Sequence, residues 1–238
     1  MTDWGALTHA YGSAADIPGL LAAAAADADD RAAWDGLWSR LCHQGTAYSA
    51  SFPALSALTA IALGHPPASY VEPLHLAAVI VASNDSPEDF DTIRRDYTRE
   101  LSTLRDLAER SLPLASGSRE YVYGLQALMA FEGAAPWSRE LEALADEELT
   151  LECPSCHEYL TVSFESTPAT TTALDDSVPS TAVTPANPAL LRGPTARLHE
   201  LARRHGRVAV SDGMLSLFGS TTCPACGIVV DLPTALTD

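Results

Sequence analysis

Two pairs of cysteines are the residues of this sequence whose type and spacing most clearly imply chemistry. Each pair has the form Cys-Pro-x-Cys, with one pair at Cys153 and Cys156 and the other at Cys223 and Cys226. Two thiolates separated by two residues can bind one metal ion from a tight turn, and two such turns complete a tetrahedral set of four sulfur ligands. The sequence therefore predicts one structural zinc ion, with no coordination position left for a substrate.

Two other uses of paired cysteines fit the sequence less well. A redox dithiol usually lies between a strand and a helix, whose N-terminus lowers the thiol pKa, whereas strand-like residues surround both pairs here. A zinc deaminase places its proline before the cysteine pair, whereas proline lies inside each pair of this chain. His157 follows the first pair, where Gly227 follows the second. His157 could replace a thiolate, but a residue adjacent to a ligand more readily points outward.

A second candidate site is an aromatic and polar cluster near the N-terminus. Tryptophans on one face of a predicted helix would form the floor of a binding groove, and histidine, glutamine and tyrosine side chains would form its edge. The cluster consists of His9, Tyr11, Trp34, Trp38, His43, Gln44 and Tyr48. The simpler alternative is structural, with the tryptophans filling a helix interface and His43 bonded to a nearby carbonyl. Cys42 is expected to pack as a small apolar residue.

The sequence contains none of the common catalytic patterns that we sought. It has no Gly-x-Ser-x-Gly, no His-Glu-x-x-His and no glycine-rich phosphate loop. It also contains no lysine, which excludes a Schiff base and a phosphate-binding lysine. No catalytic residue is therefore predicted.

The charge of the chain bears on its partners. The formal net charge is −17, and residues 1–150 hold 22 acidic residues against nine arginines. Such a surface repels nucleic acid and accelerates encounters with a basic protein, although solubility alone also explains it. We therefore expect a protein partner, basic in character, and no nucleic acid.

The N-terminal residues lack the basic and apolar segments of a signal peptide, and no apolar stretch is long enough to cross a membrane. The sequence therefore predicts a cytoplasmic protein. In a reducing compartment, cysteines in paired spacing indicate a metal site rather than disulfides.

Residues 1–148 are predicted to form a helical domain. Apolar residues recur with helical spacing, as in Trp34, Leu37, Trp38 and Leu41. Short connections imply antiparallel pairs of about 35–40 residues, the size of HEAT-like repeats, so an α-solenoid or a compact bundle is expected. The predicted helices cover residues 16–26, 31–45, 47–63, 70–82, 86–111, 119–131 and 137–147.

Residues 149–238 are predicted to form a small β zinc ribbon that is split by an insertion. Each Cys-Pro-x-Cys pair lies between two strand-like stretches. The stretch that precedes the second pair begins at Leu215. The insertion covers residues 166–207. Its first part, 166–190, is rich in Thr, Pro, Ala and Ser and is predicted to be a mobile loop, and a short helix follows at 194–205.

The N-terminal motifs resemble a group of uncharacterised bacterial HEAT-repeat-like proteins that are common in actinobacteria. Two motifs recur in this group, His-Ala-Tyr-Gly and Trp-His-Gln-Gly-Thr-x-Tyr. The matching residues are His9, Ala10, Tyr11, Gly12, His43, Gln44, Gly45, Thr46 and Tyr48, and Cys42 stands where the group usually has tryptophan. Some members also end in a Cys-Pro-x-Cys pair. The resemblance implies an α-solenoid and brings no activity with it.

These observations favour a non-catalytic scaffold or adaptor protein with a structural zinc site. One alternative is an immunity or antitoxin-type protein that neutralises a basic partner. Another, from a different class, is an enzyme that uses a groove at His43 and Tyr48.

Overall fold

The computed structural model describes residues 2–64, 72–174 and 177–237. Contacts divide the chain into two compact units, one of Met1–Ala115 with Ala127–Ala134 and the other of Ser116–Gln126 with Ala135–Asp238. This division differs from the predicted boundary at residue 148. One helix, α7 (Ser118–Glu132), contributes residues to both units, so the change from helical to strand-like sequence does not mark the boundary.

The first unit consists mainly of helices, some of which begin at aspartate caps. Asp30 accepts a hydrogen bond from the backbone N–H of Ala33 at 3.0 Å, and Asp89 accepts one from Thr92 at 2.8 Å. Besides part of α7, the elements of this unit are η1 (Trp4–Ala6), β1 (Thr8–His9), β2 (Gly12–Ser13), η2 (Ala14–Asp16), α1 (Ile17–Ala26), α2 (Arg31–Leu41), β3 (Cys42–His43), β4 (Thr46–Ala47), α3 (Ser51–Gly64), α4 (Glu72–Ala82), α5 (Phe90–Asp96), α6 (Thr98–Ser111) and η3 (Leu112–Leu114).

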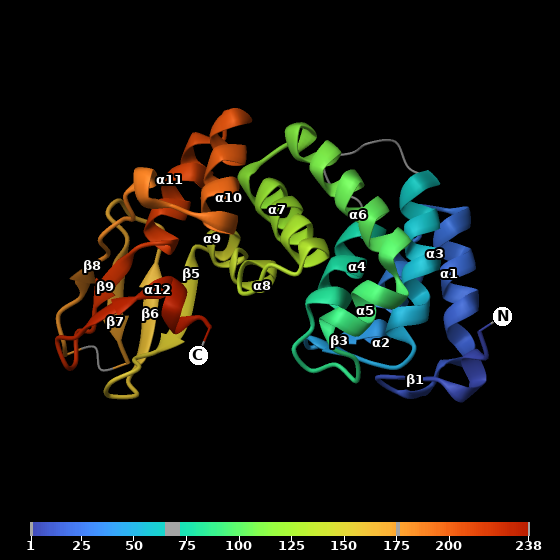
Figure 1. The fold of residues 1–238 in the computed structure, drawn as a ribbon. Coiled ribbons are helices and arrows are strands. Elements are labelled where there is room, and N and C mark those ends of the chain that lie inside the picture. Colours follow the sequence, from blue (N-terminus) through green and yellow to red (C-terminus); the bar gives the residue numbers. More distant parts are fainter. Residues whose placement is uncertain (1, 65–71, 175–176, 238) are drawn as a thin grey trace. The chain divides into compact units, whose positions relative to one another are not determined.

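The core of the first unit lies between its helices. In α2, Trp34, Leu37 and Leu41 are buried, which confirms most of the predicted apolar face. Helix α3 packs against α1, α4 and α6 (Figure 1), so it is buried on most sides. The first two residues of the helix predicted at 70–82 lie outside the described residues, and α4 covers the rest.

The helix predicted at 86–111 is interrupted. Tyr97 separates α5 from α6, with backbone angles of φ −120° and ψ 31°. The hydroxyl of Thr98 donates to the carbonyl of Arg94 at 2.7 Å, four residues earlier. Such a bond competes with the backbone ladder and bends helices, which explains why the continuous apolar pattern does not give one straight helix.

The second unit combines short helices with antiparallel strands. Besides part of α7, its helical elements are α8 (Trp137–Glu140), α9 (Ala143–Asp146), η4 (Pro188–Leu190), α10 (Gly193–Arg204), α11 (Val208–Leu217) and α12 (Leu232–Ala235). Its strands are β5 (Glu148–Glu152), β6 (Tyr159–Ser163), β7 (Thr170–Ala173), β8 (Thr181–Ala182), β9 (Ser220–Thr222) and β10 (Val229–Asp231). The helix predicted at 137–147 is present as the two short helices α8 and α9.

The strands form two sheets around the cysteine pairs. One sheet has the order β5-β6-β7-β8, and the other is the hairpin of β9 and β10. The register pairs Leu151 with Leu160, and the alternating burial along β5 and β6 leaves their apolar side chains on one face. Both cysteine pairs therefore lie between strands, as the sequence predicts.

The insertion between the cysteine pairs is more ordered than the predicted loop. Residues 170–173 add to β6 as β7, residues 181–182 add as β8, and η4 follows, while residues 175–176 lie outside the described residues. Threonine is β-branched and suits a strand, and backbone pairing with β6 requires no large apolar side chain. Composition alone therefore underestimated the structure of this segment.

The stretch that begins at Leu215 was predicted as a strand, but it continues α11. Met214 and Leu217 are buried on one face of this helix, and strand β9 begins only at Ser220. A short apolar run fits either a helix or a strand, and here packing against α10 selects the helix.

The fold is confirmed as mainly helical with small antiparallel sheets. It does not show an α-solenoid. Within the described ranges, no helix combines the length and the apolar character needed to cross a membrane.

Candidate metal centre

The first cysteine pair lies in the turn of the β5–β6 hairpin. The backbone N–H of Cys153 donates to the carbonyl of Glu158 at 2.8 Å, and that of His157 donates to the carbonyl of Cys153 at 3.0 Å. His157 has φ of 60°, a left-handed conformation that closes the turn. The chain thus folds back within six residues, with both thiols on the same turn.

The second pair repeats this geometry in the β9–β10 hairpin. The N–H of Cys223 donates to the carbonyl of Ile228 at 2.8 Å, and that of Gly227 donates to the carbonyl of Cys223 at 2.9 Å. Gly227 has φ of 77°, which glycine adopts without steric cost. The two turns are therefore equivalent in backbone structure, with His157 in the place of Gly227.

Polar contacts from the insertion hold the two hairpins together. The hydroxyls of Thr171 and Thr221 are 2.7 Å apart and buried, and Thr181 donates to the carbonyl of Thr222 at 2.6 Å. Thr184 and Ser220 also exchange backbone hydrogen bonds of 2.8 and 3.0 Å. Strands β7 and β8 thus link the first hairpin to the second, and the insertion helps to assemble the cysteine site.

The four sulfur atoms lie close enough to share one ion. The distance between the Sγ atoms of Cys153 and Cys226 is 3.8 Å, and that between Cys156 and Cys223 is also 3.8 Å. All four Sγ atoms lie within 4.8 Å of one another, and none forms a disulfide. A zinc–sulfur distance of about 2.3 Å implies an edge of about 3.8 Å between tetrahedral sulfur ligands. The spacing therefore fits a tetrahedral four-thiolate centre.

The electrostatics of the cluster also favour a cation. Burial opposes ionisation of Cys153, but the backbone N–H groups of Cys156 and Ser155 and the neighbouring thiols lower its pKa to about 7. The N–H of Glu158 favours the Cys156 thiolate, but desolvation and the neighbouring sulfurs raise the pKa of Cys156 to about 12. Burial is the main cause that raises the pKa of Cys223. One thiolate thus opposes the next, and a divalent cation removes this penalty.

His157 is not a ligand in this geometry. Its Nδ1 atom lies 2.5 Å from a carboxylate oxygen of Glu152, and its side chain is mostly exposed. The imidazole therefore points away from the sulfur atoms, as the sequence predicts.

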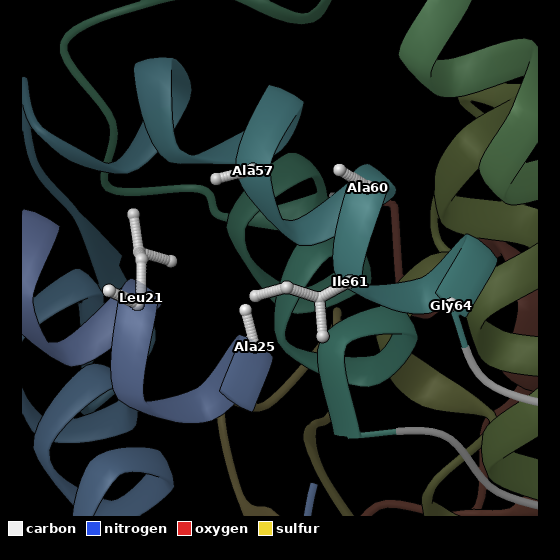
Figure 2. A pocket seen from close by; sticks show the side chains of 7 residues that line it. Leu21, Ala25, Ala57, Ala60, Ile61 and Gly64 are labelled. Atoms are coloured by element: carbon white, nitrogen blue, oxygen red, sulfur yellow. The ribbon is translucent and has the colours of Figure 1, made fainter. Parts of the chain in front are cut away.

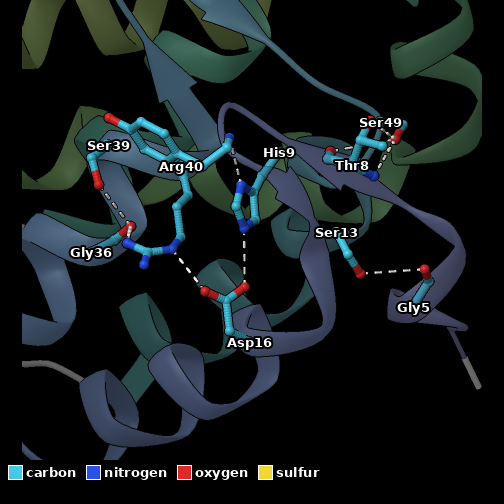
Figure 3. Close-up of polar contacts among 10 residues, drawn as sticks. Gly5, Thr8, His9, Ser13, Asp16, Gly36, Ser39, Arg40 and Ser49 are labelled. Atoms are coloured by element: carbon cyan, nitrogen blue, oxygen red, sulfur yellow. Dashed lines mark hydrogen bonds and ion pairs between the residues drawn. The ribbon is translucent and has the colours of Figure 1, made fainter.

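His9 is held in a different kind of polar site, in the first unit. Its Nε2 lies 3.1 Å from a carboxylate oxygen of Asp16, and its Nδ1 accepts the backbone N–H of Tyr11 at 2.9 Å (Figure 3). Arg40 donates to the other oxygen of Asp16 at 2.8 Å (Figure 3). Because Nδ1 accepts, Nε2 carries the proton toward Asp16. Both ring nitrogens of His9 are occupied, so it has no free nitrogen for catalysis. Asp16 links the β1–β2 hairpin to α2, because it accepts from both His9 and Arg40.

Tyr11 and His43 are the predicted groove residues that the structure brings together at the surface. Their ring centroids are 5.6 Å apart in an edge arrangement, and the Tyr11 hydroxyl lies 3.5 Å from Nδ1 of His43. Tyr11 is 64% exposed. Gln44 and Gly45 have φ of 51° and 83° and form the turn between β3 and β4, so Gln44 is exposed at its tip.

The other groove residues have structural contacts. The indole N–H of Trp34 donates to the carbonyl of Ala28 at 3.0 Å, and Trp34 is buried. Trp38 donates to Glu72 at 3.2 Å and lies against His75, with ring centroids 5.0 Å apart. The backbone N–H of Tyr48 donates to Ser51 at 2.9 Å, near the start of α3. The described contacts therefore join both tryptophans to other partners and do not place them beneath Tyr11 and His43.

Cys42 is buried, as the sequence predicts, and burial raises the pKa of its thiol to about 11. The thiol therefore stays protonated at neutral pH, which suits a packing role.

The sequence did not identify Asp16 and Arg40 as site residues. Neither residue lies within five positions of His9. It also missed a polar contact in the second unit, where the buried hydroxyl of Tyr121 lies 2.8 Å from Nδ1 of His205. Burial raises the pKa of Tyr121 to about 12, although Arg207 and Arg204 oppose this shift. Contacts between residues so far apart in the sequence leave no local signal.

An apolar pocket of about 400 Å³ lies between α1 and α3 of the first unit (Figure 2). Its lining offers no titratable or hydrogen-bonding side chain, so it has no catalytic group. The lining residues are Leu21, Ala22, Ala25, Ala57, Ala60, Ile61 and Gly64.

No protein-family model matches the chain, and no curated protein or solved structure matches it. The resemblance to HEAT-repeat-like proteins therefore remains a prediction from the N-terminal motifs. The function has to be inferred from the geometry of the sites themselves.

Proposed function

We propose that this protein binds one structural zinc ion through Cys153, Cys156, Cys223 and Cys226 and acts as a non-catalytic scaffold or adaptor for another protein. The observation that carries the proposal is the cluster of four sulfur atoms within 4.8 Å of one another. Four thiolates suit zinc, and they close its coordination shell. The ion would then hold two hairpins together and would leave no position for a reacting water.

Within this proposal, the two hairpins form a zinc ribbon, and the helices of the first unit form a HEAT-like scaffold. The thiols must stay reduced to bind the ion, which favours the cytoplasm as the compartment. The apolar contacts of the small strands would be supplemented by the metal, as in other small domains with limited cores.

Tyr11 and His43 support the binding part of the proposal. An exposed aromatic side chain on a short hairpin is a suitable interface anchor, because it buries a large area and loses little conformational entropy. The hydrogen bonds of His9 with Asp16 and Tyr11 hold this hairpin in place. The acidic character of the first unit favours a basic partner.

Elemental analysis of the purified protein tests the metal. We expect one zinc per chain, and replacement by Co²⁺ should give the intense visible absorption of a tetrahedral four-thiolate site. Cys223→Ser should lose the ion, whereas Ser155→Ala, in the first turn but not a ligand, should retain it. Iron in place of zinc, or well under one metal per chain, would overturn this assignment.

Affinity capture from the native host, followed by titration with the purified partner, tests the scaffold function. Tyr11→Ala should weaken binding, whereas Leu190→Ala, which removes an exposed apolar side chain from the second unit, should not. Binding of a basic partner should weaken as salt rises from about 50 to 500 mM, because the screening length falls from roughly 14 to about 4 Å. A turnover that depends on His43 would contradict a non-catalytic role.

A further inference from the structure

Strand β5 is an edge strand of its sheet, with β6 as its neighbour. The N–H of Cys153 donates to Glu158, and the carbonyl of Glu147 accepts from Phe164, so the odd-numbered residues of this stretch pair with β6. In an antiparallel pair, the residues between them direct their N–H and C=O groups to the opposite side. Among the described residues, the backbone groups of Glu148, Thr150 and Glu152 have no partner strand.

This edge is accessible. Glu148, Thr150 and Glu152 are exposed, while Leu149 and Leu151 between them are buried. The outward side chains continue across the sheet, because the register pairs Thr150 with Thr161 and Glu152 with Tyr159. The exposed face next to the edge is therefore mainly polar, and its apolar side chains lie at the cysteine end.

Two exposed apolar side chains, Tyr159 and Leu174, lie at the cysteine end of this face. Pairing of Leu160 with Ala173 places Leu174 opposite Tyr159 on the neighbouring strand. Tyr159 is 60% and Leu174 is 78% exposed. This apolar pair lies on the exposed face one and two strands in from the open edge of β5, so a strand added at that edge would lie beside β5 itself.

The charge of this region is mainly negative, although Nδ1 of His157 lies 2.5 Å from a carboxylate oxygen of Glu152 at the cysteine end of the strand. The sequence contains no arginine between Arg139 and Arg192, and the chain has no lysine. Glu148 and Glu152 lie on the same side of β5, four residues apart, on either side of Thr150. A second copy of the strand, paired antiparallel about Thr150, would place glutamate opposite glutamate, which is destabilising. A strand with arginine or lysine at those positions would be stabilised instead.

We propose that the edge of β5 accepts an extended, basic segment of another protein as an additional strand of the sheet. The recognised pattern is a basic residue, any residue, a β-branched residue, any residue and a second basic residue. The basic side chains pair with Glu148 and Glu152, and the central residue lies beside Thr150. Backbone hydrogen bonds supply the part of the affinity that does not depend on the sequence of the segment. This inference rests on the proposed function as a protein-binding scaffold and adds the partner's chemistry.

The probe is a capped peptide of seven residues with arginine at its second and sixth positions, threonine at its centre and valine between them. Titrated into the zinc-loaded full-length protein, it should slow hydrogen exchange at the amides of Glu148, Thr150 and Glu152. The same peptide with glutamate for arginine should not bind. A peptide methylated on the central amide nitrogen should also fail, because it cannot complete the ladder.

Variants of the protein distinguish the contribution of the charged side chains to peptide binding from that of the backbone hydrogen bonds. The double change Glu148→Arg and Glu152→Arg should weaken peptide binding roughly tenfold or more, because two attractive pairs become repulsive. Asp35→Arg, on an exposed face of α2 in the other unit, is the control and should leave binding unchanged. Thr150→Pro removes an N–H that faces away from β6, which edge strands tolerate, and it should abolish binding without loss of zinc.

The inference is overturned if the arginine peptide does not bind, if the charge-reversed protein binds it equally well, or if exchange slows elsewhere. It is also overturned if the protein alone dimerises through this edge in a manner that Thr150→Pro abolishes. These results leave the proposed function intact as long as the partner from the host still binds and remains sensitive to Tyr11→Ala. If the peptide binds but no cellular partner is found, the edge site stands and the scaffold proposal fails.

Discussion

The cysteine centre of the second unit and the His9 site of the first unit each join segments that are distant along the chain, but they differ in their charge. At the His9 site, Asp16 accepts from both His9 and Arg40, so the groups of the chain satisfy one another. At the cysteine centre, four thiols face each other with sulfur distances as short as 3.8 Å. The first site is complete as folded, whereas the second needs a cation to be stable when ionised.

Removal of the metal should therefore affect the two units very differently. Chelation, or Cys223→Ser, should destabilise the region from β5 to β10 by several kcal/mol, because structural zinc sites contribute roughly 10 kcal/mol or more to folding. Hydrogen exchange measured by mass spectrometry should rise in this region and stay slow in α1 to α4. Equal exchange with and without chelator would show that the hairpins hold together without the ion.

The packing between the hairpins gives a second, smaller test. A Cβ atom at Gly219 would clash with the backbone carbonyl of Thr184, where the insertion pairs with β9. Gly219→Ala should cost about 1–3 kcal/mol, because backbone atoms cannot move aside easily. Gly19→Ala, in α1, has no neighbouring atom in the way and should be stabilising, since alanine favours helices. Chemical denaturation should separate the two variants, and a neutral Gly219→Ala would contradict the close approach.

The Asp16 carboxylate makes the first unit sensitive to acid. Desolvation opposes its ionisation, but the hydrogen bonds from Arg40 and from the backbone N–H of Asp16 hold the pKa of Asp16 below its usual 3.8. A lowered pKa in the folded state stabilises the protein above pH about 4, and this contribution is lost as the pH falls through the folded-state value.

Asp16→Asn should therefore reduce the loss of thermal stability between about pH 5 and 2. The effect should be below about 1 kcal/mol, because the carboxylate is half exposed and screened by water. Circular dichroism at several pH values measures it, with Asp35→Asn as the control. An unchanged pH profile would show that the Asp16 contacts do not contribute to stability.

The two cysteine turns allow the finest comparison. His157 adopts the left-handed conformation that Gly227 adopts in the other turn, with φ of 60° and 77°. His157→Gly should stabilise the protein by about 0.5 kcal/mol, because it removes strain of about 1 kcal/mol and loses only an exposed contact with Glu152. Gly227→His should destabilise it by a similar amount. Thermal unfolding measures both, and loss of zinc on His157→Gly would show that the imidazole is a ligand.

Much of the helical part could be predicted from the sequence, because helices have local causes. The apolar spacing of Trp34, Leu37 and Leu41, and the cap at Asp30, act within one or two turns of chain. The errors lie where a local pattern meets a competing contact. The helix predicted through Tyr97 is interrupted because Thr98 bonds to Arg94, and the strand predicted at Leu215 is a helix because it packs on α10.

The candidate sites also have one part that the sequence predicts and another that depends on tertiary contacts. The sequence alone determined the four cysteines and the two turns, because residue type and a spacing of three positions define a metal-binding turn. Only the tertiary structure decided that the two turns meet, that β7 and β8 link them, and that Asp16 and Arg40 hold His9. It also gave the two tryptophans contacts with Ala28, Glu72 and His75, and left the edge of β5 exposed. These outcomes depend on contacts between segments tens of residues apart, and such contacts leave no periodic mark in the sequence.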